Sequence, residues 1–341
     1  MGLPPHEDLE GLVAICIAHT SHLLSVLVLY KLTRTLFPAV SKQPLAFATS
    51  LLHVISPAGL FLSAPYAESS CALLSFLGSL LFTQSFLNQK QSPASRDLLI
   101  GAAGIVFAIA TTFRSNALLN GLLFLEEAFR LLASLRHGIA LGTIRRLILT
   151  GLGGSIIGIG FVVPQYIAYT DFCGQEDRIL ARPWCNKAIP SIYTFVQDHY
   201  WNVGFLRYWT VSNIPLFMLA TPMLGILTKS GLLTLTGGLV EPADGSETRT
   251  ATQKPGVDEN EVPTNTLVRN MAVSQLILTA LTLTSAHVQI ITRISSAYPV
   301  WMWYIGRTAL TSRVKTDYFI RFMVMYAVIQ GVLFSSFLPP A

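Results

Sequence analysis

Four polar clusters, at 53–69, 114–120, 208–215 and 289–299, interrupt an otherwise apolar chain, and their residue types suit the binding of a phosphate-bearing lipid. The candidate substrate-binding residues in these clusters are Ser63, Pro65, Tyr66, Ser69, Arg114, Asn116, Asn213, Gln289, Arg293, Ser295 and Ser296. A guanidinium group presents a planar fork of donors that matches a phosphate. We therefore expect an arginine to stabilise phosphate and the hydroxyl and amide groups to orient the substrates.

The charged candidates also have structural interpretations. Arg114 follows an apolar run, where an arginine at a membrane border often extends toward the head groups instead of binding a ligand. Glu68 is the only acid of the first cluster, and it could act as a general base only if it faced a cavity. Its more ordinary role is to pair with Arg114 across the ends of adjacent helices.

The elements that carry these clusters must be membrane helices. Of the 341 residues 52% are apolar and 12% are charged, whereas about a quarter of an ordinary soluble domain is charged. Lipid-exposed backbone must be helical or closed into a barrel, and the apolar runs are continuous instead of alternating. We predict an all-α polytopic membrane protein with about nine spans, at 11–30, 45–62, 69–87, 98–113, 116–133, 147–168, 210–228, 267–290 and 318–338.

Basic residues gather in three loops, at 31–42, 90–96 and 130–146, that fall on one face of the membrane. The positive-inside rule assigns this face to the cytosol. The turn 63–69 and the loop 169–209 then lie on the luminal face, together with the other polar clusters. Polar groups are costly in a membrane, so several that meet at one depth indicate a site. The chemistry that matches best is transfer involving a lipid-borne substrate.

The predicted organisation has six parts. They are a luminal remnant (1–10), the first six spans (11–168), a luminal loop domain (169–209), one span (210–228), a cytosolic disordered linker (229–266), and C-terminal spans with a basic luminal segment (267–341). The basic segment, which includes Arg307 and Lys315, violates the charge rule in this topology. Cys173 and Cys185 lie in the loop domain, and an oxidising lumen would favour a disulfide between them.

Several familiar motifs are absent from the sequence. There is no P-loop, no dinucleotide-binding glycine pattern, no HExxH and no paired-cysteine metal set. Nucleotide hydrolysis and zinc chemistry are therefore not expected, and we predict no metal, no cofactor and no nucleic-acid partner.

Four segments carry a resemblance over nearly the whole chain: SPAGLFLSAPYAES (56–69), FRSN (113–116), YWNVGFLRYW with SNIP (200–215) and HVQIITRISSAYP (287–299). They are similar to the PIG-V type GPI mannosyltransferase 2 family. The resemblance implies a GT-C-like bundle in the endoplasmic reticulum membrane that uses dolichyl-phosphate mannose to add the second, α1,6-linked mannose to the GPI precursor. It also suggests a small accessory membrane subunit as a partner.

The resemblance implies an inverting mechanism in which an acid takes the acceptor proton while the bond between C1 and the phosphate breaks. No diphosphate leaves, so a metal is not required. Here Arg114 or Arg293 would stabilise phosphate, while Tyr66, Asn116 and Ser295 would orient donor or acceptor.

Two departures from the family pattern stand out. Leu216 replaces an asparagine after Asn213-Ile-Pro215. Family members also begin with a further helix and a luminal loop bearing the catalytic acid, and this chain starts after that loop. The charge-derived topology independently places residues 1–10 in the lumen with no span before them. We therefore expect an N-terminal truncation with impaired activity, an unidentified catalytic base, and Glu68 as a weak substitute.

The sequence alone is also compatible with two other classes of protein. The chain could be a polytopic lipid or solute transporter or scramblase, although no internal repeat, which would favour a transporter, is visible. It could also be a non-catalytic homologue that scaffolds GPI assembly.

Overall fold

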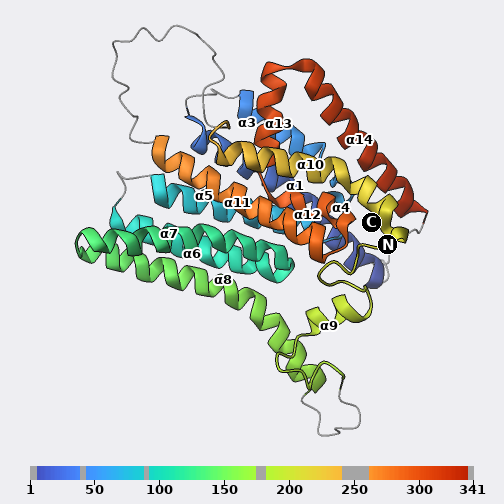
Figure 1. The fold of residues 1–341 in the computed structure, drawn as a ribbon, viewed down its shortest axis with the longest axis horizontal. Helices are drawn as coiled ribbons and strands as arrows, with labels where there is room; N and C mark the ends of the chain where they lie inside the picture. The colour runs from blue at the N-terminus through green and yellow to red at the C-terminus, as the bar shows by residue number, and fades with distance from the viewer. Residues whose placement is uncertain (1–5, 39–43, 88–91, 174–181, 240–260, 337–341) are drawn as a thin grey trace, which may run out of the picture.

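The structure, a computed structural model, describes residues 6–38, 44–87, 92–173, 182–239 and 261–336. Within these ranges it is helical and holds no strand (Figure 1). The α-helices are α1 (His6–Leu36), α3 (Pro44–Val54), α4 (Gly59–Ser63), α5 (Glu68–Leu87), α6 (Pro93–Phe113), α7 (Gly121–Ser134), α8 (Leu141–Cys173), α9 (Ile192–His199), α10 (Ile214–Leu235), α11 (Glu261–Ser285), α12 (Ile291–Ile294), α13 (Val300–Thr311) and α14 (Arg313–Ser335). Short 3₁₀ turns include η1 (Ser115–Asn120), η5 (Val288–Ile290) and η6 (Ser295–Ala297).

Seven helical segments in the described residues are long and apolar enough to cross a membrane. They are Leu9–Leu36, Glu68–Leu87, Pro93–Phe113, Leu141–Cys173, Val211–Leu235, Thr264–Ser285 and Arg313–Ser335. This confirms the all-α polytopic membrane class. The other two predicted runs form shorter helices: 45–62 divides into α3 and α4, and 116–133 becomes η1 followed by α7, which has 14 residues.

The break between α3 and α4 has a local cause. Pro57 has no N–H to donate, and the Ser56 hydroxyl accepts a hydrogen bond from the Ala58 N–H at 3.2 Å. The backbone N–H of Gly59 then returns to the Ser56 carbonyl at 2.8 Å. The chain is thereby turned so that α4 leads directly into the 63–69 turn.

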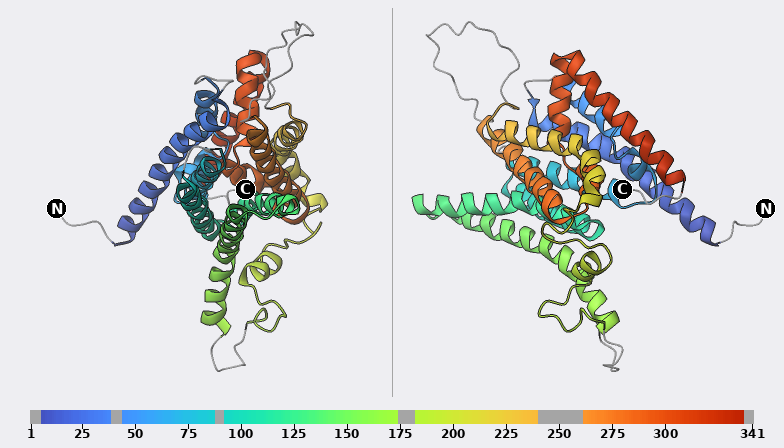
Figure 2. Two further views of the ribbon diagram at one scale, coloured as in Figure 1. Left: turned by 90° about the vertical axis from the view of Figure 1, so that its left-hand side faces the viewer. Right: turned by 45° about the vertical axis from the view of Figure 1, so that its right-hand side comes forward.

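The helices run back and forth, so the polar clusters gather at one end of the bundle, which we call the Glu68 end. It holds the 63–69 turn, Arg114 and residues 286–299; Figure 1 shows α4 next to α12 there, with α9 below them, and Figure 2 shows the same bundle from two other sides. The opposite end, which we call the basic end, holds the last turn of α1, the start of α6 and the junction of α7 with α8.

Small residues allow α6 and α8 to pack closely. A Cβ atom added at Gly160 would lie 2.4 Å from the Ala108 carbonyl oxygen, and one at Gly104 would lie 2.8 Å from the Cα of Gly153. Such small-residue contacts are a common way for membrane helices to approach each other. They fix α8 against α6 beside Arg114.

The predicted topology places the basic segment at the same end as the polar clusters, whereas in the structure α13 carries the chain back to the basic end. Trp303 Nε1 donates to Thr33 Oγ1 at 2.9 Å, and Arg307 donates to the Leu239 carbonyl. The predicted span 267–290 also ends early, since α11 stops at Ser285 and short helical turns follow. Arg307 and Arg313 therefore lie at the same end as the other basic loops.

The predicted linker 229–266 is also wrong at both of its ends. Helix α10 continues to Leu235 and α11 begins at Glu261, while residues 240–260 lie outside the described residues. The predicted loop 169–209 likewise starts within α8 and includes α9, and the predicted remnant 1–10 includes the start of α1 at His6. Figure 1 shows the last turns of α8 leaving the bundle with α9 beside them, and α8 contains Pro164.

Candidate active site

Glu68 is the first residue of α5 and lies at the centre of the Glu68 end. The residue is 1% exposed. Its Oε1 atom accepts hydrogen bonds from Arg114 Nη1 at 2.7 Å and from Arg293 Nε at 2.8 Å, and Arg293 Nη2 lies 2.6 Å away. One carboxylate thus holds two guanidinium groups, and this triad carries a net charge of +1.

Arg114 reaches the triad because α6 ends at that residue. Its backbone is extended, with φ −148° and ψ 126°, and its N–H still donates to the Ala110 carbonyl at 3.0 Å. The chain then enters the 3₁₀ turn η1. The side chain is 18% exposed, so one of its faces meets Glu68 while the residue remains accessible.

Arg293 comes from α12, a four-residue helix between two 3₁₀ turns. Its guanidinium carbon lies 4.1 Å from the ring centroid of Phe61 and 5.0 Å from that of Tyr66. Guanidinium groups are attracted to the faces of aromatic rings at such distances. Arg293 is therefore enclosed by two rings and a carboxylate, which suits it to a structural role.

A cleft of about 360 Å³ opens beside Arg114. The end of α6, the middle of α8, helix α9 and residues 286–294 form its walls. Its lining residues are Thr111, Thr112, Phe113, Arg114, Ser115, Asn116, Gly160, Phe161, Pro164, Gln165, Tyr193, Gln197, Ala286, His287, Ile290 and Ile294. Arg114 is the only one of these with a formal charge at neutral pH, and the amides, hydroxyls and apolar side chains around it suit a polar ligand with an apolar tail.

Two nitrogen atoms of lining residues are buried without a hydrogen-bond partner among the described residues: Asn116 Nδ2 and His287 Nε2. A buried polar atom left unpaired costs about 1–3 kcal/mol, so these two nitrogen atoms are free to bind a polar group that enters the cleft. Trp201 and Tyr208 pack edge-on against His287, with ring centroids 5.4 and 4.9 Å away. Burial lowers the pKa of His287, which favours the neutral imidazole.

The structure brings Tyr66, Glu68, Arg114 and Arg293 together and places Asn116 in the cleft. Other predicted residues make local bonds outside it. Asn213 donates to the Tyr208 carbonyl, Gln289 accepts from the Tyr208 hydroxyl, Ser295 donates to the Thr292 carbonyl and Ser296 donates to the Arg293 carbonyl. Ser63, Pro65 and the buried Ser69 lie around the turn but do not line the cleft.

Sequence reasoning did not select Gln165, Tyr193, Gln197, His287 or Phe61. Gln165 Oε1 accepts hydrogen bonds from the Ser191 hydroxyl at 3.0 Å and the Tyr193 N–H at 3.1 Å, which ties α9 to α8. A glutamine directly after Pro164 in an apolar run was the available signal. Tyr193 and Gln197 lie on α9, and Phe61 and His287 lie within the polar segments 56–69 and 287–299. Nothing in the sequence distinguishes these four residues from their neighbours.

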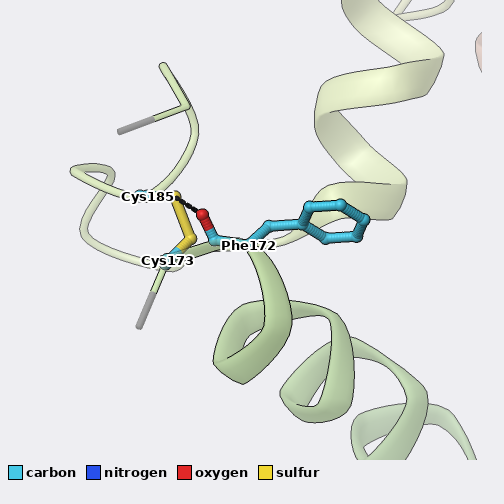
Figure 3. Close-up of a disulfide and its surroundings, with 3 residues drawn as sticks. All are labelled: Phe172, Cys173 and Cys185. Atoms are coloured by element: carbon cyan, nitrogen blue, oxygen red, sulfur yellow. Dashed lines mark hydrogen bonds between the residues drawn. A yellow bond between two sulfur atoms is a disulfide. The ribbon is translucent and has the colours of Figure 1, made fainter. Parts of the chain in front are cut away.

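Cys173 and Cys185 form a disulfide at the end of α8, with their Cα atoms 5.7 Å apart (Figure 3). Nearby Trp184 is 2% exposed and faces the ring of Tyr169. The disulfide joins the last residue of α8 to the segment before α9. It therefore helps to hold α9, which forms one wall of the cleft.

The described residues contain no group of three or more His, Cys, Asp or Glu side chains arranged to hold a metal ion. The expectation that no metal is needed stays a prediction.

These features define a multi-pass membrane protein with a cationic, polar cleft at one end of its helical bundle. Residues 7–341 match the family described as Mannosyltransferase (PIG-V), and the chain belongs to this family. This confirms the resemblance that the four polar segments indicate.

Curated relatives carry the name GPI mannosyltransferase 2. The protein from Chaetomium globosum is 48% identical over 97% of this chain and 71% of its own length. The relatives from Gibberella zeae and Aspergillus oryzae are 46% and 42% identical, over 100% and 98% of this chain and 77% and 75% of their own lengths. No solved structure matches the chain.

Proposed function

We propose that this protein transfers mannose from dolichyl-phosphate mannose to a GPI-anchor precursor in the endoplasmic reticulum membrane, adding the second, α1,6-linked mannose. Membership of a mannosyltransferase family and the shared name of the relatives support this proposal. The structural observation that carries it is that Arg114, fixed by Glu68, lines the cleft at the Glu68 end.

The donor phosphate binds at Arg114. The acceptor hydroxyl oxygen attacks C1 of the mannose and gives its proton to a base other than Glu68. The bond between C1 and the phosphate oxygen breaks at the same time, with its electron pair going to the phosphate. Negative charge therefore grows on the departing dolichyl phosphate. A preorganised guanidinium group in a site of low dielectric stabilises such charge without reorganisation. The net charge of +1 on the triad provides this stabilisation.

Glu68 positions the two arginines and does not act as the base. It is almost fully buried and does not line the cleft, and its Oε1 atom already accepts from two guanidinium groups. A base must reach the proton that it removes, either directly or through one water molecule. Arg293 supports the same arrangement from the other side, against Phe61 and Tyr66.

The other lining residues bind the neutral parts of the substrates. Asn116 and His287 supply unpaired nitrogen atoms, and Gln165 and Gln197 add amides. Apolar lining residues such as Phe113 and Phe161 accommodate the first isoprene units of the donor. The cleft thus offers polar contacts for a sugar phosphate and apolar contacts for its lipid.

The Glu68 end is luminal in this proposal and the basic end is cytosolic. Lys31, Arg34, Arg136 and, through the return of α13, Arg313 all lie at the basic end. Short basic loops favour the cytosolic face. Because α13 returns to the basic end, the basic segment no longer violates the positive-inside rule.

The test is complementation of cells that lack the enzyme for the second mannose. Expression of this chain should restore GPI-anchored proteins at the cell surface, and Arg114→Gln should fail to restore them at equal protein level. Transport of a lipid or solute by the purified protein in liposomes, without mannosyl transfer, would instead support the transporter interpretation.

A further inference from the structure

A second cationic cleft lies at the basic end of the bundle, remote from the Glu68 end. It has a volume of about 270 Å³ and lies between the first turn of α6, the last turns of α7 and the first turns of α8. Four arginines line it, Arg96, Arg130, Arg145 and Arg146, with two carboxylates, Asp97 and Glu127. These six side chains leave a charge excess of +2. The proposed mannosyl transfer uses none of them.

Ion pairs fix the positions of these arginines. The carboxylate of Glu127, a residue 1% exposed, accepts from Arg130 Nη2 at 2.5 Å and from Arg146 Nε at 3.3 Å. Asp97 pairs with Arg145 at 2.8 Å, and Arg96 Nε donates to the Ser85 carbonyl at 3.1 Å. The cleft is therefore organised before any ligand binds.

Arg146 provides independent evidence for a missing acceptor. Its side chain is 9% exposed and lines the cleft, and its Nη1 atom donates to the Ser85 hydroxyl at 2.8 Å. Its Nη2 atom is buried without a hydrogen-bond partner among the described residues. An unpaired nitrogen on a buried guanidinium is costly, and an anionic oxygen would satisfy it.

Two long helices, α6 with 21 residues and α8 with 33, also begin at this cleft. Helix N-termini carry a partial positive charge that favours phosphate groups. The helix dipoles therefore add to the positive charge of the four arginines.

Apolar surface adjoins the cleft on the outside of the bundle. Leu98, Phe129 and Leu141 are 74%, 63% and 83% exposed. A groove of about 570 Å³ between α7 and α11 shares Arg130 with the cleft; Leu122, Leu125, Phe129 and Val273 form its apolar part, and Glu126 and Asn270 its polar part. A ligand with both a phosphate and acyl chains would fill both features.

We propose that the cleft formed by Arg96, Arg130, Arg145 and Arg146 binds the phosphate group of an anionic membrane lipid whose chains lie along the apolar surface of α7. This site is distinct from the donor cleft and does not depend on the proposed transfer reaction. It would anchor the ends of α6, α7 and α8 at the membrane face.

Native mass spectrometry of the purified full chain tests this proposal, with dioctanoyl phosphatidic acid, dioctanoyl phosphatidylcholine and inorganic phosphate as probes. Arg130 and Arg145 are about half exposed, so Arg130→Gln and Arg145→Gln should fold. Arg136→Gln is the matched control, because Arg136 is exposed at the same end and does not line the cleft. Thermal unfolding of each variant without lipid checks its fold.

We expect wild type and Arg136→Gln to retain phosphatidic acid in preference to phosphatidylcholine. Each cleft variant should bind phosphatidic acid about tenfold more weakly, as expected for the loss of one charge-assisted hydrogen bond. Binding of inorganic phosphate that the cleft variants lose, without a preference for phosphatidic acid, would assign the same anion site to a soluble phosphate. The proposal would be overturned if all variants bound the two lipids equally well. It would also be overturned if Arg136→Gln lost as much affinity for phosphatidic acid as the cleft variants.

Discussion

The carboxylate of Glu68 lies 2.7 Å from the guanidinium group of Arg114, 46 residues further along the chain, and only the arginine lines the cleft. The acid is 1% exposed and the arginine side chain 18%. This relationship separates two roles that the sequence left open for Glu68. The acid holds the cations in place, and the proposed function assigns the contact with the ligand to Arg114.

Glu68→Gln should destabilise the protein strongly, because it leaves Arg114 and Arg293 without a counter-charge in a buried environment. Removing one partner of a buried ion pair costs about 3–5 kcal/mol. Thermal unfolding in detergent, followed by intrinsic fluorescence, measures the loss. Asp198→Asn is the control, since its pair with Arg207 is exposed and such pairs are worth about 0–1 kcal/mol. Equal midpoints for the two variants would show that Glu68 has no such role.

Gly160→Ala should lower both stability and activity. The added Cβ would meet the Ala108 backbone at 2.4 Å and force α8 away from α6, and overpacking of this kind costs about 1–3 kcal/mol. The cleft wall at Phe161 and Gln165 would move with α8. Gly158→Ala is the matched control, because nothing lies within 4 Å of its added Cβ. A similar loss of activity in both variants would contradict this explanation.

Cys173→Ser with Cys185→Ser should lower the free energy of unfolding by about 2–3 kcal/mol, because the bond restricts the unfolded chain. Alkylation without reductant, read by mass spectrometry, should leave both cysteines of the wild type unmodified. Cys16→Ser is the control, as Cys16 is an exposed free thiol. Free thiols at both Cys173 and Cys185 in freshly extracted protein would argue against the luminal position of their segment.

His287 should make the wild type sensitive to acid. Burial lowers its pKa in the folded state, so the unfolded chain binds the proton more readily and stability falls as pH drops through the ordinary histidine range. Between about pH 7.5 and about pH 5.5, the unfolding midpoint of wild type should fall more than that of His287→Gln. Parallel pH profiles for the two proteins would show that His287 is not buried as described.

The membrane class, the Glu68 turn and its pairing with Arg114 could be inferred from sequence because they depend on local signals. Apolar runs, prolines and a lone acid beside an apolar segment are visible in the residues themselves. Arg293 could be named as a candidate, although its place over Phe61 and Tyr66 depends on a contact between segments more than 200 residues apart.

The return of α13 could not be inferred. Its 12 residues are too few to cross a membrane, and α11 stops at Ser285 although apolar residues continue. The decisive contacts, such as Trp303 with Thr33, join distant parts of the chain. The second cleft could not be inferred for a similar reason, because its arginines lie in three separate helices and the sequence shows them only as ordinary basic loops.

The most direct test of the central claim is the rate of mannose transfer from radiolabelled dolichyl-phosphate mannose to a GPI precursor in membranes that contain wild type or Arg114→Gln. Loss of the phosphate-stabilising cation should lower the rate constant about 100-fold or more, as when a comparable transition-state donor is removed. Arg207→Gln, an exposed arginine at the same end, should transfer at the wild-type rate. A near-normal rate for Arg114→Gln at equal protein level would contradict the account.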